Sequence, residues 1–167
     1  VAITDPSADA LASVPSRIAA SLVPLNASDE ADAVCSRLSL HASTAEAVSD
    51  AEFVFEAGPE KLDIKHAIFA EVEAHAPSDA ILASNTSVIQ ITKIMAHLNG
   101  QHRALGTHWW NPPHMIPLVE VVKTEWTDTS TAQTMFDLLA DAGKTPVMVE
   151  KDVPGFIGNR LQHALWR

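Results

Sequence analysis

The sequence has little of several features that mark whole classes of protein. Cys35 is the only cysteine among 167 residues, so no internal disulfide can form, and a reducing compartment is favoured over secretion. No apolar run reaches transmembrane length and no signal peptide is recognisable, so we expect no membrane partner. There is no basic cluster, and the formal net charge of −10 argues against a nucleic-acid partner.

Glycine is scarce as well. The chain contains only six glycines, and no two of them are separated by a single residue. This spacing excludes a Gly-x-Gly-x-x-Gly turn from the sequence. Such a turn is the usual way for a backbone to approach the pyrophosphate of a dinucleotide at a helix N-terminus.

What the chain does have is apolar content and a regular alternation of elements. Hydrophobic residues make up 47% of the sequence, enough for one domain with a real core. We expect strands over 1–5, 37–41, 52–57, 80–83, 103–108, 118–123 and 145–150. We expect helices over 8–22, 61–76, 90–98 and 129–142, and two further helices that begin at 43 and at 156. Residues 24–36 are expected to form a loop with a short helix. This order predicts an α/β fold, most simply a Rossmann-like, doubly wound and mostly parallel sheet.

Local signals support several of these boundaries. Ser43 to Glu46 has the spacing of a capping box, which opens a helix. The nearly continuous apolar run from Glu52 to Ala57 indicates a buried strand. Gly143 is suited to a left-handed cap at the end of the 129–142 helix, and Pro154-Gly155 breaks the chain before the final helix.

The most informative pair of residues is His108 and Glu120. His108 ends one apolar run, and Glu120 lies between Leu and Val residues in the next, where an unpartnered carboxylate is expensive to bury. A histidine oriented by a carboxylate is a common arrangement for a general base near neutral pH. The alternative is structural: a strand-end histidine with satisfied hydrogen bonds and a carboxylate at a sheet edge.

Four blocks in the same order carry a family resemblance. They are Phe55–Glu60 with Lys65, Ala83–Ser87, His108–Val122 and Pro154–Leu161. Over nearly its whole length the chain resembles the NAD-binding domain of the L-3-hydroxyacyl-CoA dehydrogenase family. The resemblance implies NAD as cofactor, a small-molecule substrate and a homodimeric full-length protein.

The resemblance also implies a domain organisation. Residues 1–153 correspond to a partial NAD-binding Rossmann domain, truncated at the N-terminus, because the family's first strand and its Gly-rich turn would precede Val1. Residues 154–167 correspond to the first helix leading into a C-terminal helical domain that this sequence lacks. We therefore expect the complete protein to be an enzyme and this chain, taken alone, to be inactive.

Site residues follow from the resemblance position by position. His108 is the expected general base and Glu120 its orienting carboxylate, while Ser87 and Asn159 are expected near the substrate's oxygens. For Ser87 the alternative is a helix cap, and for Asn159 a residue on a helix surface.

Four further residues are expected to contact NAD: Asp5, Glu60, Lys65 and Asn111. Asp5 would bind the ribose hydroxyls at the end of its strand. The alternatives are an ordinary Asp-Pro turn for Asp5, a solvated surface pair for Glu60 and Lys65, and a turn-forming residue for Asn111. No metal site is expected, because the remaining histidines show no ligand spacing with cysteines or acids.

The substrate stays open between two branches of the family. The first expectation is oxidation of the 3-hydroxyl of an L-3-hydroxyacyl-CoA, in the cytoplasm, with mitochondria and peroxisomes left open. Pro112-Pro113 and Ile116–Glu120 lean instead toward dehydrogenases of free hydroxy acids, of the L-gulonate or L-carnitine type. A third alternative is a non-catalytic protein, truncated or crystallin-like, which the missing Gly-rich turn favours.

Overall fold

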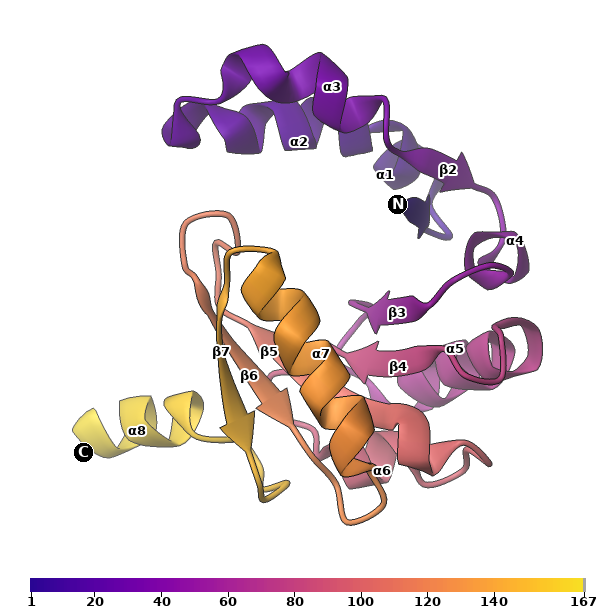
Figure 1. Ribbon diagram of the computed structural model, residues 1–167, viewed down its shortest axis with the longest axis vertical. Coiled ribbons are helices and arrows are strands. Elements are labelled where there is room, and N and C mark those ends of the chain that lie inside the picture. The colour runs from indigo at the N-terminus through magenta and orange to yellow at the C-terminus, as the bar shows by residue number, and fades with distance from the viewer. Residues whose placement is uncertain (167) are drawn as a thin grey trace.

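The computed structural model describes residues 1–166, which form two β-sheets with helices around them (Figure 1). The strands are β1 (Ala2–Thr4), β2 (Ser39–His41), β3 (Phe53–Glu56), β4 (Ile81–Ser84), β5 (Ala104–Trp109), β6 (Leu118–Val122) and β7 (Thr145–Val149). The α-helices are α1 (Ala8–Ala12), α2 (Val14–Leu22), α3 (Ala31–Cys35), α4 (Thr44–Val48), α5 (Leu62–His75), α6 (Ile91–Met95), α7 (Thr129–Asp141) and α8 (Gly158–Leu165). Short 3-10 turns occupy Val23–Leu25, Ser28–Glu30 and Gln101–Arg103.

The larger sheet has five strands in the order β3-β4-β5-β6-β7. All neighbours are parallel except β5 and β6, which run antiparallel. The predicted mostly parallel α/β sheet is therefore confirmed. Because β6 is reversed, its first residues lie beside the carboxyl end of β5, and this edge carries the candidate site.

Helices cover both faces of the five-stranded sheet, as in a doubly wound fold. On one face, Phe69 and Val72 of α5 and Ile94 of α6 pack in a cluster with Leu82 of β4 and Val122 of β6. On the other face, Met135 and Leu139 of α7 pack with residues of β4, β5 and β6. Period-two alternation along each strand explains how one sheet serves two cores.

The N-terminal region is built differently. β1 and β2 form a separate two-stranded parallel sheet, and α1, α2 and α3 contain no buried residue. Figure 1 shows these helices arching away from the five-stranded sheet. Within residues 1–166, no strand pairing joins the two sheets.

Two expected elements differ in the structure. The single helix over 8–22 is wrong, because the chain breaks at Ser13 into α1 and α2. Pro15 lies in the first turn of α2, where its missing N–H is tolerated but could not continue α1. The strand expected to be buried over 52–57 is shorter and only partly buried, with Phe55 43% exposed, because β3 pairs with β4 alone.

Two local predictions hold, and the start of the final helix differs. The hydroxyl of Ser43 accepts from the N–H of Glu46 at the start of α4, and Gly143 adopts a left-handed φ of 77° after α7. The final helix begins at Gly158 rather than Phe156, since Gly155 and Phe156 both have positive φ (75° and 49°). Within the part of the chain that the structure describes, no helix is long and apolar enough to cross a membrane.

Candidate active site

His108 and Glu120 face each other across the antiparallel pair β5–β6, where they are register partners. Nδ1 of His108 lies 2.7 Å from Oε2 of Glu120, and both side chains are buried, Glu120 being 2% exposed. An ionised carboxylate can only accept, so this contact assigns the ring hydrogen to Nδ1 and leaves the Nε2 lone pair available on the neutral ring.

The other oxygen of Glu120 is held by the N-terminus of α8. The backbone N–H groups of Ile157 and Gly158 donate to Oε1 at 2.8 and 3.0 Å, and the indole of Trp110 donates weakly to Oε2 at 3.4 Å. Burial opposes ionisation of Glu120, but the hydrogen bond from His108 and the two amides outweigh it, so the pKa of Glu120 lies below its ordinary value. Glu120 is thus kept ionised against its buried surroundings.

Aromatic rings pack around the imidazole of His108. The ring of Trp110 lies 5.7 Å and that of Phe156 5.6 Å from it, centroid to centroid. Phe156 is held in the left-handed region of the backbone, which costs a bulky residue about 1 kcal/mol or more. Among residues 1–166, no side chain or backbone group hydrogen-bonds Nε2 of His108, so the packing orients the ring and leaves that nitrogen for a ligand.

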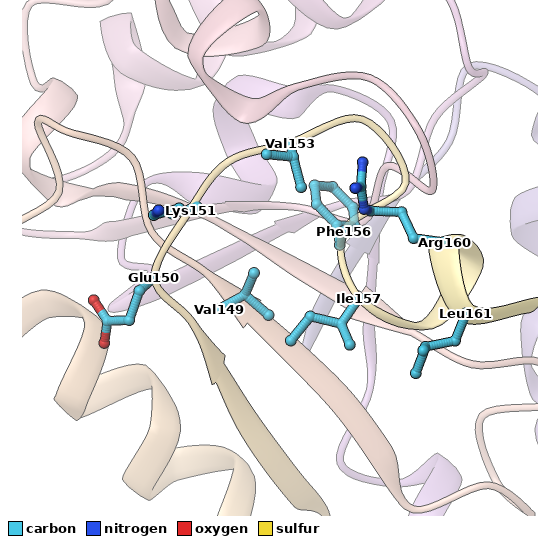
Figure 2. Close-up of a pocket in the computed structure, with 8 residues that line it drawn as sticks. All are labelled: Val149, Glu150, Lys151, Val153, Phe156, Ile157, Arg160 and Leu161. Carbon is cyan, nitrogen blue, oxygen red and sulfur yellow. The ribbon is translucent and has the colours of Figure 1, made fainter. Parts of the chain in front are cut away.

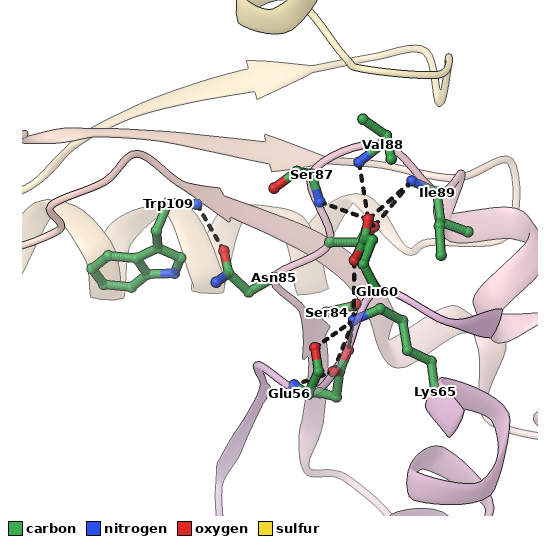
Figure 3. Close-up of polar contacts among 11 residues, drawn as sticks. Glu56, Glu60, Lys65, Ser84, Asn85, Ser87, Val88, Ile89 and Trp109 are labelled. Carbon is green, nitrogen blue, oxygen red and sulfur yellow. Dashed lines mark hydrogen bonds and ion pairs between the residues drawn. The ribbon is translucent and has the colours of Figure 1, made fainter. Parts of the chain in front are cut away.

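A second carboxylate, Glu60, lies beneath the turn that follows β4 (Figure 3). Its Oε1 accepts from the hydroxyl of Thr86 and from the N–H groups of Ser87 (3.1 Å), Val88 (3.2 Å) and Ile89 (3.4 Å). Burial raises the pKa of Glu60, but these donors and the charge of Lys65 together bring it below its ordinary value. The carboxylate therefore fixes the main chain that carries Ser87.

Lys65 is the most buried charged residue of this region, with 1% of its side chain exposed. Its Nζ lies 2.9 and 3.0 Å from the two oxygens of Glu56 and 3.5 Å from Oε2 of Glu60. Ser84 of β4 also donates to Glu56, at 2.6 Å. The alternative of a solvated surface pair is therefore wrong for Lys65, because Glu56, nine residues earlier, draws its ammonium into the interior.

Asn159 and Ser87 are brought together although 72 residues separate them. The side-chain Nδ2 of Asn159 donates to the backbone oxygen of Ser87 at 2.9 Å. Asn159 follows Gly158, whose N–H contacts Glu120, so one short segment contacts both Glu120 and the turn that Glu60 holds. Of the two residues expected near the substrate, Ser87 lies in that turn, and Asn159 connects the turn to the segment that contacts Glu120.

Asp5 and Asn111 are not drawn into these contacts. Asp5 directly follows β1, and its Oδ1 accepts from the N–H of Ser7 at 2.8 Å, a local turn of the kind that the alternative describes. Asn111 is exposed after β5 and precedes Pro112 through a cis peptide bond. Their expected contacts with NAD remain predictions.

An open cavity of about 640 Å³ lies beside Phe156 and the start of α8 (Figure 2). It is lined by Val149, Glu150, Lys151, Val153, Phe156, Ile157, Arg160 and Leu161. None of the site residues expected from the sequence lines it, so we assign it no part in the chemistry.

Several residues of the site escaped sequence reasoning. Glu56 is a carboxylate in an apolar strand, Phe53-Val54-Phe55-Glu56, and the argument that singled out Glu120 applies to it equally. The amides of Ile157 and Gly158 had no such signal, because backbone donors carry no side-chain identity.

A mostly parallel sheet with a histidine–carboxylate pair at the carboxyl end of a strand defines a domain of the nucleotide-dependent dehydrogenase type. The chain belongs to the 3-hydroxyacyl-CoA dehydrogenase family, through its NAD-binding domain, whose family profile matches residues 1–153. The expected family and the NAD-binding character of the domain are therefore confirmed.

The relatives are named for different substrates. The chain is 45% identical over 122 residues to 5-formyl-3-hydroxy-2-methylpyridine 4-carboxylate 5-dehydrogenase of Mesorhizobium japonicum, covering 73% of this chain and 40% of that protein. It is 42% identical over 131 residues to L-carnitine dehydrogenase of Streptomyces griseus, covering 78% of this chain and 39% of the relative. The chain thus spans well under half of the length of these curated relatives.

A solved structure agrees with the fold. The crystal structure of 3-hydroxybutyryl-CoA dehydrogenase from Escherichia coli superposes with a TM-score of 0.88 at 32% identity, over 96% of this chain and 35% of that chain. The sheet and the covering helices are therefore those of this enzyme family.

Proposed function

We propose that the complete protein containing this chain is an NAD-dependent dehydrogenase that oxidises the hydroxyl group of a small hydroxy acid. The observation that carries the proposal is the buried contact of 2.7 Å between His108 and Glu120, which leaves Nε2 of the imidazole without a protein partner among residues 1–166. A neutral imidazole held in one tautomer by a carboxylate is suited to accept a hydroxyl proton.

In this proposal the substrate hydroxyl donates to Nε2 of His108. His108 would take the hydroxyl proton at Nε2, while bound NAD would take the carbon-bound hydrogen as hydride, and the C–O bond would become a carbonyl. Glu120 accepts throughout from Nδ1–H and stabilises the imidazolium. The amides of Ile157 and Gly158 keep the carboxylate ionised for this purpose.

The polar groups near this pair fit a nicotinamide cofactor and an oxygen-bearing substrate. Bound NAD would supply the hydride acceptor, while Oε2 of Glu60 and the exposed amide of Asn111 are the protein groups proposed to hold it. Ser87 and Asn159, joined at 2.9 Å, are proposed to position the substrate's oxygens. Asp5 is proposed to bind the ribose from the smaller sheet.

For the substrate, we place a free hydroxy acid of the L-carnitine type ahead of an L-3-hydroxyacyl-CoA thioester, which reverses the order expected from the resemblance. The L-carnitine dehydrogenase of S. griseus is 42% identical to this chain over 131 residues, and further L-carnitine dehydrogenases stand among the similar curated proteins. In addition, the half-buried Trp110 places its aromatic ring 5.7 Å from the imidazole, and such rings attract quaternary ammonium groups. The thioester is the second candidate, because it gives the family its name.

The domain organisation belongs to the same proposal. Residues 1–153 are proposed to be the cofactor domain, and residues 154–167 the beginning of the segment that leads to a helical domain, with a homodimer and a cytoplasmic location for the complete protein. Size-exclusion chromatography with light scattering tests the dimer.

The test of the reaction is NAD reduction by the complete gene product, followed at the nicotinamide absorbance with L-carnitine, L-gulonate and L-3-hydroxybutyryl-CoA in parallel. Turnover of L-carnitine or L-gulonate alone supports the free-acid branch, and turnover of the thioester alone moves the protein to the other branch. NAD binding without turnover of any of the three would contradict the proposed reaction and favour a non-catalytic relative.

A further inference from the structure

The charge cluster beneath the 86–89 turn contains a carboxylate, Glu56, that the proposed reaction does not use. One ammonium, Lys65, faces both Glu56 and Glu60, so the three groups together carry one negative charge. Glu56 and Lys65 are buried, whereas Glu60 is 38% exposed. The surplus negative charge therefore falls at Glu60, the member that solvent and ligands reach.

The ammonium of Lys65 has no capacity left for a ligand. Its three hydrogens face both oxygens of Glu56 at 2.9 and 3.0 Å, the backbone oxygen of Gly58 at 3.4 Å and Oε2 of Glu60 at 3.5 Å. With 1% of the side chain exposed, a direct contact to a cofactor would require the loss of one of these partners. Any influence of Lys65 on the cofactor must pass through its neighbours.

Glu56 holds the lysine in place from the strand side. Its oxygens also accept from the N–H of Gly58 and the hydroxyl of Ser84, each at 2.6 Å (Figure 3). Since Glu56 ends β3 and Ser84 ends β4, and the two are register partners, the carboxylate is anchored to the sheet itself. Lys65 then transmits this fixed position to Glu60.

We propose that Glu56 and Lys65 are positioning residues: a buried ion pair that fixes Glu60, and through Glu60 the Ser87–Ile89 backbone at the cofactor side of the site. This inference rests on the proposed function, which identifies that side of the site as the one that binds the cofactor. In this proposal Lys65 acts through Glu60, in place of the direct contact with NAD expected from the resemblance. Glu56 holds Lys65 to the sheet.

The variant that tests this removes both buried charges. Replacing one member of a buried ion pair leaves the other unpaired and is strongly destabilising, whereas replacing both by groups of similar volume is far milder. Glu56→Gln/Lys65→Met therefore tests positioning with the fold retained. Glu56→Asp, which keeps the charge but withdraws it by one methylene, serves if the double variant fails to fold.

Amide hydrogen exchange of the complete gene product, without ligand, measures directly how firmly the backbone of the turn is held. In the double variant we expect the N–H groups of Ser87, Val88 and Ile89 to exchange about tenfold faster, the size expected for weakening one hydrogen bond to a charged group. Glu56→Asp is expected to have about a threefold effect in the same direction. Unchanged exchange in both variants would overturn the proposal.

The matched control lies at the other end of α5. Glu73 also accepts from backbone N–H groups, those of Asn99 (3.1 Å) and Gly100 (2.7 Å). Neither of these contacts involves the turn that carries Ser87. Glu73→Gln is expected to speed exchange at Asn99 and Gly100 and to leave the Ser87–Ile89 amides unchanged.

Calorimetric titration with NAD then connects the turn to the cofactor. We expect the Kd for NAD to rise about tenfold in Glu56→Gln/Lys65→Met and to stay unchanged in Glu73→Gln. A loosened turn with an unchanged Kd would overturn the cofactor side of the proposal. If both readouts move as expected while no hydroxy acid is oxidised, the proposed reaction fails and the positioning role stands.

Discussion

The two carboxylates of the candidate site, Glu120 and Glu60, are each stabilised in the ionised form, but by different partners. Each is an acid with several donors, and for each the pKa lies below its ordinary value despite burial. Glu120 is held by donors from β5, the loop after it and the start of α8, and its charged partner is a histidine. Glu60 is held by one turn and by the ammonium of Lys65.

We call the His108–Glu120 pair the responsive centre and the Glu60–Lys65 pair the fixed centre, because only the first takes part in the proposed proton transfer. The partner of Glu120 changes its charge when it takes up a proton, so the strength of that contact varies during a proton transfer. Lys65 takes no part in the proposed proton transfer, so its contact with Glu60 does not change during the reaction. Variants at the first centre should therefore affect chemistry, and variants at the second should affect binding.

The largest effect is expected from His108→Gln in the complete gene product. Loss of a general base lowers kcat by about 10²- to 10⁴-fold. The Kd for NAD should stay within about twofold, because the imidazole contacts the reacting hydroxyl in the proposed chemistry. Steady-state kinetics and calorimetry measure the two, and a parallel loss of turnover and of NAD binding would make His108 structural.

Glu120→Gln should have the next largest effect. The glutamine amide would donate to Nδ1 of His108, which forces the hydrogen onto Nε2 and removes the lone pair that accepts the proton. We expect kcat to fall by about 10²-fold. The ring hydrogens are visible in nitrogen-15 spectra of histidine, and an unchanged tautomer in the variant would refute this explanation.

At the fixed centre, Glu60→Gln should act on binding. The amide oxygen still accepts from the Ser87–Ile89 backbone, but the attraction to Lys65 is lost, so the Kd for NAD should rise by about threefold to tenfold with kcat changed less. The split between KM for NAD and kcat distinguishes this centre from Glu120. A larger loss in kcat than in KM would place Glu60 in the chemistry.

The smallest effect concerns acid stability. For Glu120, Glu60 and Glu73 the folded-state pKa lies below the ordinary value of 4.5, so the unfolded chain binds more protons in that range. Their stabilisation is present above about pH 4.5 and is lost as the pH falls through the folded-state pKa values. Glu73→Gln should make the loss of unfolding free energy with acid shallower, measured by urea titrations at several pH values, and an unchanged slope would contradict this.

The sequence predicted the larger sheet and the central pair well, and the reason is physical. Strong apolar runs set the strands, and a carboxylate inside such a run, Glu120, needs a partner that only a few residues can supply. The antiparallel register that places His108 opposite Glu120 was not foreseen, because register depends on the loop between the strands as much as on the strands.

Other features depended on contacts that no local pattern carries. Lys65 lies near the start of an amphipathic helix and is buried only because Glu56, at the end of the preceding strand, holds it. The break between α1 and α2 was missed because apolar spacing continues through Ser13 while Pro15 interrupts the hydrogen bonds.

Gly158 and Trp110 carry a consequence for the evolutionary history of the site. A Cβ atom at position 158 would overlap the indole of Trp110, so the large ring is compatible only with glycine there. The two positions should therefore change together across lineages, with a smaller ring at 110 wherever 158 bears a side chain. A side chain at 158 beside an unchanged Trp110 would push α8 away from Glu120, so a smaller residue at 110 has to be fixed before position 158 changes if the base is to stay oriented.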